Sequence, residues 1–130
     1  MLIISIRTDK PEAEIGLFEG ETKLAYETWH AYRELSATIH QKLASLLESQ
    51  HKQLEDVAGI VCYQGPGSFT GLRIGLTVAN TLAYGLSVPI KGAMGDDWIL
   101  HGIKALESGS SDVQVMPEYG AEAHITLPKK

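Results

Sequence analysis

The sequence is organised around the stretch Gly65-Pro66-Gly67-Ser68-Phe69-Thr70-Gly71-Leu72-Arg73. The apolar run Ile60-Val61-Cys62-Tyr63 precedes it and has the composition of a buried strand. Glycine tolerates positive φ and close backbone approach, and proline fixes its own φ, so the stretch predicts a tight strand-to-helix turn. The hydroxyl of Ser68 or of Thr70 could cap the following helix by accepting a backbone N–H of its first turn.

The helix predicted after this turn, ending at about Gly85, has a broad apolar surface. Its polar residues form one narrow stripe: Arg73, Thr77, Asn80 and Tyr84. Small residues recur every four positions, at Gly71, Gly75, Ala79 and Ala83. A surface helix needs an apolar stripe only about 100° wide, and this helix offers roughly twice that. Either the helix is buried in its own core, or it lies between its own sheet and a partner protein.

Length and composition indicate one domain, residues 1–130, with 44% hydrophobic and 21% charged residues. The net charge of −5 argues against strong nucleic-acid binding by this chain alone, because phosphate contacts need clustered lysine and arginine. Cys62 is a single cysteine in an apolar strand, which favours a buried hydrophobe over a disulfide. We find no signal-peptide pattern and no apolar run of about 18 residues, and therefore expect a cytoplasmic protein without a membrane span.

Periodicity predicts an antiparallel meander followed by helical crossovers. The expected strands are residues 2–6, 13–17, 23–29, 60–63, 87–90 and 113–117. The expected helices are residues 32–50, the helix after the glycine-rich turn, and residues 96–107. The order β-β-β-α-β-α-β-α-β is an α/β architecture with a mixed sheet, and it fits the ribonuclease-H-like sheet of actin-like ATPase domains.

The glycine-rich turn does not have the spacing of the common phosphate-binding loops. A Walker A loop continues from its last glycine with Lys-Ser/Thr, whereas Gly71 is followed by Leu72-Arg73. A dinucleotide loop has glycines at relative positions one, three and six, whereas Gly65, Gly67 and Gly71 occupy one, three and seven. We therefore favour a structural turn over a nucleotide site.

Hydrolytic and metal chemistry are also poorly supported. A serine hydrolase would use Ser68 or Thr70, but the segment from Gly67 reads Gly-Ser-Phe-Thr-Gly and lacks the Gly-x-Ser-x-Gly elbow. The five histidines, which are His30, His40, His51, His101 and His124, form no pair with metal-ligand spacing. Acidic residues near Asp9 could hold Mg²⁺, but we favour a solvated strand edge. We expect no catalytic residue, cofactor or metal in this chain.

The segment Gly65–Gly75 closely resembles the signature of the TsaB (YeaZ) family of tRNA threonylcarbamoyladenosine biosynthesis proteins. The resemblance extends through the opening strand, Glu34-Leu35-Ser36, residues 54–61 and Val88-Pro89-Ile90. It resumes at Met116-Pro117-Glu118-Tyr119, which is similar to a late Pro-x-Tyr segment of that family.

The resemblance implies an actin-like, ribonuclease-H-like fold and a non-catalytic role. Such proteins pair with TsaD, which carries the metal and the transferase site, and act with the ATPase TsaE. Together they transfer threonylcarbamoyl from threonylcarbamoyl-AMP to the tRNA adenosine next to the anticodon, so this chain would meet ATP, metal and tRNA only through the complex. TsaB proteins use their first two helices for TsaD and for homodimers. The interface residues expected here are Leu35, Ile39, Leu43, Leu72, Leu76 and Ala79.

Two departures from the family pattern bear on function. Family members have two lobes, and the second lobe is expected to be missing here, with the deletion near residues 108–112. Catalytic members of the superfamily end the first strand with an aspartate, where this chain has Arg7, a cation that repels Mg²⁺. The alternatives are an actin-like nucleotide-binding ATPase with the turn at the phosphates and, less favoured, a peptidase that uses Ser68.

Overall fold

The computed structural model describes residues 1–31, 34–67 and 69–118. Its strands are β1 (Leu2–Arg7), β2 (Glu12–Glu19), β3 (Thr22–His30), β4 (Gly59–Tyr63) and β5 (Ile90–Ala93). Its helices are α1 (Leu35–Ser49), the short 3-10 helix η2 (Leu54–Asp56), α2 (Phe69–Leu86) and α3 (Trp98–Glu107).

The five strands form one mixed sheet in the order β3-β2-β1-β4-β5. β1, β2 and β3 are an antiparallel meander, as predicted, and β4 and β5 add parallel to β1. β1 and β4 are central and read as almost continuous apolar runs, since both of their faces are covered.

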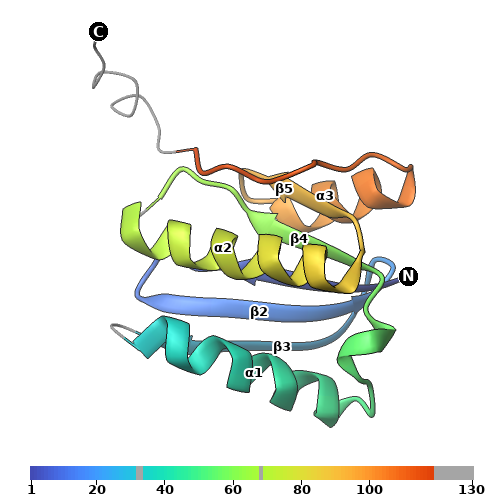
Figure 1. The fold of residues 1–130 in the computed structure, drawn as a ribbon, viewed down its shortest axis with the longest axis horizontal. Coiled ribbons are helices and arrows are strands. Elements are labelled where there is room, and N and C mark those ends of the chain that lie inside the picture. Colours follow the sequence, from blue (N-terminus) through green and yellow to red (C-terminus); the bar gives the residue numbers. More distant parts are fainter. Residues whose placement is uncertain (32–33, 68, 119–130) are drawn as a thin grey trace, which may run out of the picture.

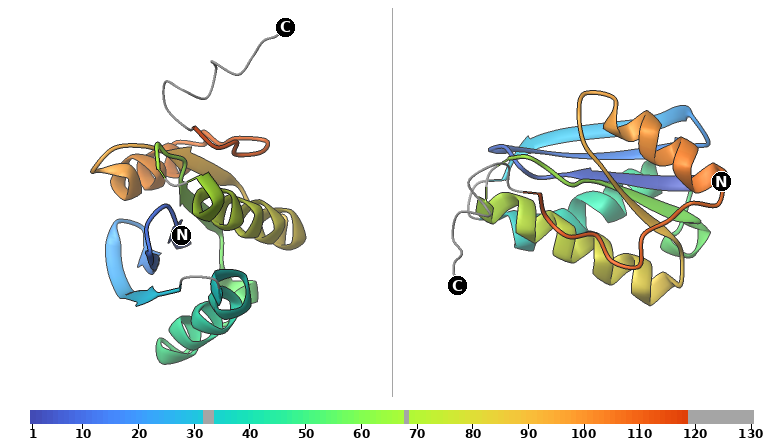
Figure 2. Two further views of the ribbon diagram at one scale, coloured as in Figure 1. Left: turned by 90° about the vertical axis from the view of Figure 1, so that its left-hand side faces the viewer. Right: turned by 90° about the horizontal axis from the view of Figure 1, so that it is seen from above.

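Helices cover the two faces of the sheet unequally. α1 packs on β2 and β3, and α2 packs on β1, β4 and β5 of the same face, while α3 covers β4 and β5 from the other side (Figures 1 and 2). The core lies between these layers and includes completely buried side chains from the sheet and all three helices, among them Ile4, Ile15, Ile39, Leu72 and Ile103. The two helices on one face, α1 and α2, therefore present a shared outer surface.

The broad apolar surface of α2 is used inside the chain. Leu72, Leu76, Ala79 and Ala83 are buried, whereas the predicted polar residues Arg73, Thr77 and Tyr84 are exposed. The first of the two interpretations, a helix in its own core, thus accounts for most of the apolar arc. The solvent-facing side of α2 consists of the polar stripe and the residues next to it.

The predicted last strand, residues 113–117, is wrong. The only β-type pairing there is one isolated bridge between Asp112 and Ile90. Beyond it, residues 112–118, which we call the strap, run alongside α2 without a partner strand (Figures 1 and 2). The Gly92 N–H donates a hydrogen bond to the Asp112 carboxylate. The Asn80 side chain bonds to both the carbonyl and the N–H of Val115. These backbone groups therefore pair with side chains, and the ladder between strands does not continue.

Helix boundaries also differ from the prediction. α1 begins at Leu35 rather than at Tyr32, which lies outside the described residues, and α3 begins at Trp98 rather than at Asp96. α2 begins at Phe69, so Thr70 is inside its first turn and is not the capping residue. Ser68, the other predicted cap, lies outside the described residues.

Candidate interaction surface

The end of β1, beside the glycine-rich turn, is filled by side chains of this chain. At the end of β1, Arg7 Nε donates a hydrogen bond to Asp9 Oδ1 at 2.7 Å. The Arg7 guanidinium also stacks on the Tyr63 ring, 3.8 Å from its centre, and the Tyr63 hydroxyl donates to the Pro66 carbonyl at 2.9 Å. Arg7, the last residue of β1, is thus held by Asp9 and by Tyr63 of β4, and the Tyr63 hydroxyl in turn bonds to the glycine-rich turn.

The glycine-rich turn itself packs directly on the residues that follow β1. A side chain at Gly67 would overlap Asp9, and a side chain at Gly75 would overlap Thr8. Thr8 is buried, and its hydroxyl donates to the Gly71 carbonyl at 2.7 Å. The glycines therefore permit a close contact within the chain, which supports the structural interpretation of the turn over a nucleotide site.

The acidic residues near this turn are paired with neighbours rather than converging on one point. Glu14 accepts a hydrogen bond from the Tyr26 hydroxyl at 2.6 Å and pairs with Lys10 Nζ at 2.9 Å. Burial raises the pKa of Glu14, but the bonds from Tyr26 and Lys10 outweigh it, and the pKa lies below its ordinary value. Within residues 1–31, 34–67 and 69–118, no group of three His, Cys, Asp or Glu residues is placed to hold a metal ion.

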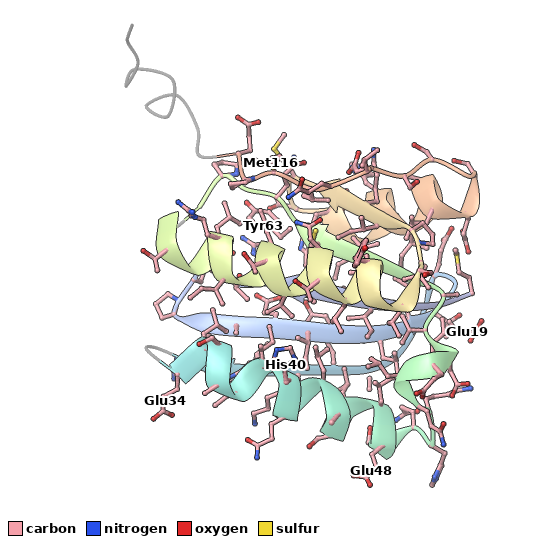
Figure 3. The ribbon with its side chains drawn as sticks, in the orientation of Figure 1. Glu19, Glu34, His40, Glu48, Tyr63 and Met116 are labelled. Atoms are coloured by element: carbon pink, nitrogen blue, oxygen red, sulfur yellow. The ribbon has the colours of Figure 1, made fainter. Side chains whose placement is uncertain are left out.

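The outer surface of α1 and α2 contains a shallow groove, which we call the helix groove. It has a volume of about 490 Å³ and is lined by Ser36 of α1 and by Thr70, Arg73, Ile74, Thr77 and Val78 of α2. Among the described residues of its lining, Arg73 is the only charged one, although the whole chain has a net charge of −5. In Figure 3, Glu34, the residue before α1, and Glu48 of α1 point away from α2. The groove is thus a mostly uncharged surface on an acidic chain.

The residues predicted to form the partner interface lie elsewhere. Leu35, Ile39, Leu43, Leu72, Leu76 and Ala79 all lie in the chain's own core, each at most 5% exposed. The prediction named the correct two helices, α1 and α2, but the apolar side of each helix packs on the sheet. The exposed surface of the same two helices is formed by their neighbours, such as Ser36, Ile74 and Thr77.

Periodicity alone gave only part of this surface. The sequence predicts Arg73 and Thr77 as members of the polar stripe of α2. Ser36 gave no signal, because a serine in the first turn of a helix is common whatever that helix contacts. Thr8 was also missed, since nothing in the sequence shows that a turn after the first strand would contact a helix more than sixty residues later.

Comparison with known proteins gives a consistent result. Residues 29–94, about half of the chain, match the family TsaD: tRNA N6-adenosine threonylcarbamoyltransferase. The tRNA threonylcarbamoyladenosine biosynthesis protein TsaB of Bacillus subtilis is 36% identical over 90 residues, which cover 69% of this chain and 39% of that protein. The tRNA N6-adenosine threonylcarbamoyltransferase of Methylobacillus flagellatus is 30% identical over 108 residues, which cover 71% of this chain and 32% of that protein.

Solved structures show the same relationship. YeaZ from Pseudomonas aeruginosa superposes with a TM-score of 0.67 and 25% identity, over 83% of this chain and 50% of that one. RuvC of Thermus thermophilus superposes with a TM-score of 0.51 and 14% identity, over 72% of this chain and 64% of that one, which shows a shared fold alone.

The sheet order, the helix placement and these superpositions define a ribonuclease-H-like domain of the actin-like type. Within that class, the chain belongs to the TsaB (YeaZ) family, which is related to the TsaD transferases. The chain spans about two fifths of the length of the curated TsaB relative that it matches. None of the described helices has the length and apolar character needed to cross a membrane.

Proposed function

We propose that this chain is a non-catalytic subunit that pairs, through α1 and α2, with a subunit of the TsaD type. In the proposal, the complex transfers threonylcarbamoyl to the tRNA adenosine next to the anticodon. The helix groove is the observation that carries the pairing: it is exposed, and among the described residues that line it Arg73 is the only charged one. Protein interfaces are depleted of charged residues at their centre, because removing an unpaired charge from water is costly.

The environment of Arg7 supports the non-catalytic part of the proposal. A guanidinium held by Asp9 and Tyr63 puts a positive charge at the end of β1, and such a charge repels Mg²⁺. The proposal therefore assigns ATP and metal to partner subunits, the TsaD-type transferase and a TsaE-type ATPase, and none to this chain. Because the chain has an acidic net charge, the proposal also assigns tRNA contact to the partners. The proposed complex acts in the cytoplasm. A homodimer through the same helices would compete with the partner for one surface.

Reconstituted threonylcarbamoyl transfer tests this function. Purified TsaD-type and TsaE-type proteins from the same source are incubated with tRNA and threonylcarbamoyl-AMP, with and without the chain. We expect transfer to require the chain in addition to its partners, and the chain alone to give none. Because some relatives are named as the transferase itself, the chain-alone reaction matters. Transfer by the chain alone, or equal transfer without it, would contradict the proposal.

Titration with Mg-ATP separates this function from the ATPase alternative. We expect no binding at micromolar concentrations, because Arg7 and the Thr8–Gly71 contact occupy the region beside the turn. Micromolar binding by the chain alone would instead favour an actin-like ATPase.

A further inference from the structure

Hydrogen bonds hold the strap against α2 and against the residue that follows β4. Asn80 Nδ2 donates to the Val115 carbonyl, and the Val115 N–H donates to Asn80 Oδ1, both at 2.9 Å. Gln64 Nε2 donates to the Met116 carbonyl at 2.9 Å, and the Glu118 N–H donates to the Gln64 carbonyl at 2.8 Å. The Val115 side chain is buried. These contacts fix the strap as part of the domain.

A second groove lies between α2 and the strap, and we call it the strap groove. It has a volume of about 380 Å³ and is lined by Arg73, Leu76, Thr77 and Asn80 of α2 and by strap residues 114–117. Arg73 and Thr77 also line the helix groove, so α2 forms a ridge with one groove on each side. Figure 3 shows Met116 on the strap, on the side of α2 opposite to α1.

We propose that the TsaD-type subunit contacts both grooves, so that its surface lies across the ridge of α2 and reaches Met116 on the strap. This inference rests on the proposed function and adds to it a second part of the interface. The strap lies outside residues 29–94, over which the chain matches the TsaD family. The two grooves share Arg73 and Thr77, so a partner that covers the exposed ridge borders the strap groove as well.

The chemistry of the strap groove fits the same partner as the helix groove. The described residues of its lining include no carboxylate, and Arg73 is again the only charged residue among them. Met116 is 60% exposed at its edge, and an exposed, flexible methionine can pack against an apolar surface of varied shape. Because hydrogen bonds already hold the strap, little conformational entropy is lost when a partner packs on it. We therefore expect a partner surface that is largely uncharged and apolar.

The test compares two strap variants that introduce the same charge. Met116→Asp puts a carboxylate at the edge of the strap groove. The control, Val113→Asp, puts it at a fully exposed position on the strap that does not line the groove. Both side chains point to solvent, so neither substitution disturbs the core. Ser36→Lys adds a cation to the helix groove alone. Affinity for the TsaD-type subunit is measured by calorimetry, and folding by thermal unfolding.

We expect Met116→Asp to weaken binding at least tenfold, Val113→Asp to leave it within twofold, and Ser36→Lys to weaken it at least tenfold. If Ser36→Lys weakens binding but Met116→Asp does not, the strap groove is not part of the interface, while the proposed function stands. Equal weakening by both strap variants would also overturn the inference, because the effect would not depend on the groove. If the unaltered chain does not bind, the proposed function fails, and this inference fails with it.

Discussion

The Arg7 guanidinium lies 3.8 Å from the centre of the Tyr63 ring and joins the end of β1 to the end of β4. The same side chain pairs with Asp9, whose carboxylate is only 7% exposed. An internal ion pair and a cation–π contact thus connect the ends of these two neighbouring strands.

Arg7→Ala should lower the free energy of unfolding by about 1–3 kcal/mol, because it removes the cation–π contact and leaves Asp9 buried without its partner. Lys10→Ala is the control: Lys10 also pairs with a carboxylate, but its side chain is 45% exposed, and we expect a loss of at most about 0.5 kcal/mol. Denaturation in urea measures both. A loss for Arg7→Ala no larger than that of the control would show that the pair contributes little to stability.

Gly75→Ala should destabilise the domain by about 1–3 kcal/mol, because the added methyl group would overlap Thr8 and push α2 from β1. Gly85→Ala, near the end of the same helix, has nothing within 4 Å of the added carbon. There we expect no loss, and up to about 1 kcal/mol of gain from higher helix propensity. Thermal unfolding of the two variants gives the comparison, and similar melting temperatures would contradict the close contact of Gly75 with Thr8.

Leu76→Arg should unfold the domain, and Thr77→Arg should not. From the sequence, Leu76 was expected to face a partner, so that its replacement would leave the monomer folded. Leu76 is instead 3% exposed in the core, where a guanidinium would be buried without a partner, whereas Thr77 is exposed. Circular dichroism distinguishes the two variants. We further expect the folded Thr77→Arg protein to bind the TsaD-type subunit at least tenfold more weakly, and native affinity would exclude the ridge of α2 from the interface.

The sheet and its helices could be predicted from the sequence, because their residues follow simple periods. Ile15 and Leu17 alternate with polar or small neighbours as a strand requires, and Ile39, Leu43 and Leu46 recur at helical spacing. The side of each helix that meets the sheet follows less directly. Helical periodicity places each residue of α2 around the helix axis. Because the apolar arc is so broad, it does not show which part of that arc faces the sheet and which part faces outward.

The strap shows why local pattern fails at a sheet edge. Val113 and Val115 alternate with polar residues as in a strand, yet Val113 is fully exposed, and Val115 is held by a side chain of α2. The partner of Val115 is Asn80, 35 residues earlier, and only the folded chain brings the two together. The two grooves of the candidate interface depend on the packing of α2 between α1 and the strap, so they could not be predicted from local sequence patterns.

The pKa of Glu14 should rise toward its ordinary value in Tyr26→Phe, because the hydrogen bond from the Tyr26 hydroxyl is lost. NMR titration of the Glu14 carboxyl measures this. Since the folded-state pKa is below the unfolded value, Glu14 stabilises the fold above its unfolded pKa, and the contribution disappears as pH falls through the folded pKa. The stability difference between the native chain and Glu14→Gln should therefore shrink on acidification, and a difference that grows would contradict the assigned pairing.

The central claim is that the exposed surface of α1 and α2 binds a transferase subunit. Size-exclusion chromatography with light scattering, on the chain alone and mixed with the TsaD-type subunit from the same source, tests it most directly. We predict a one-to-one complex that Thr77→Arg disrupts. A stable homodimer that persists unchanged when the TsaD-type subunit is added would contradict the account, because the surface would then be occupied by a second copy of the chain.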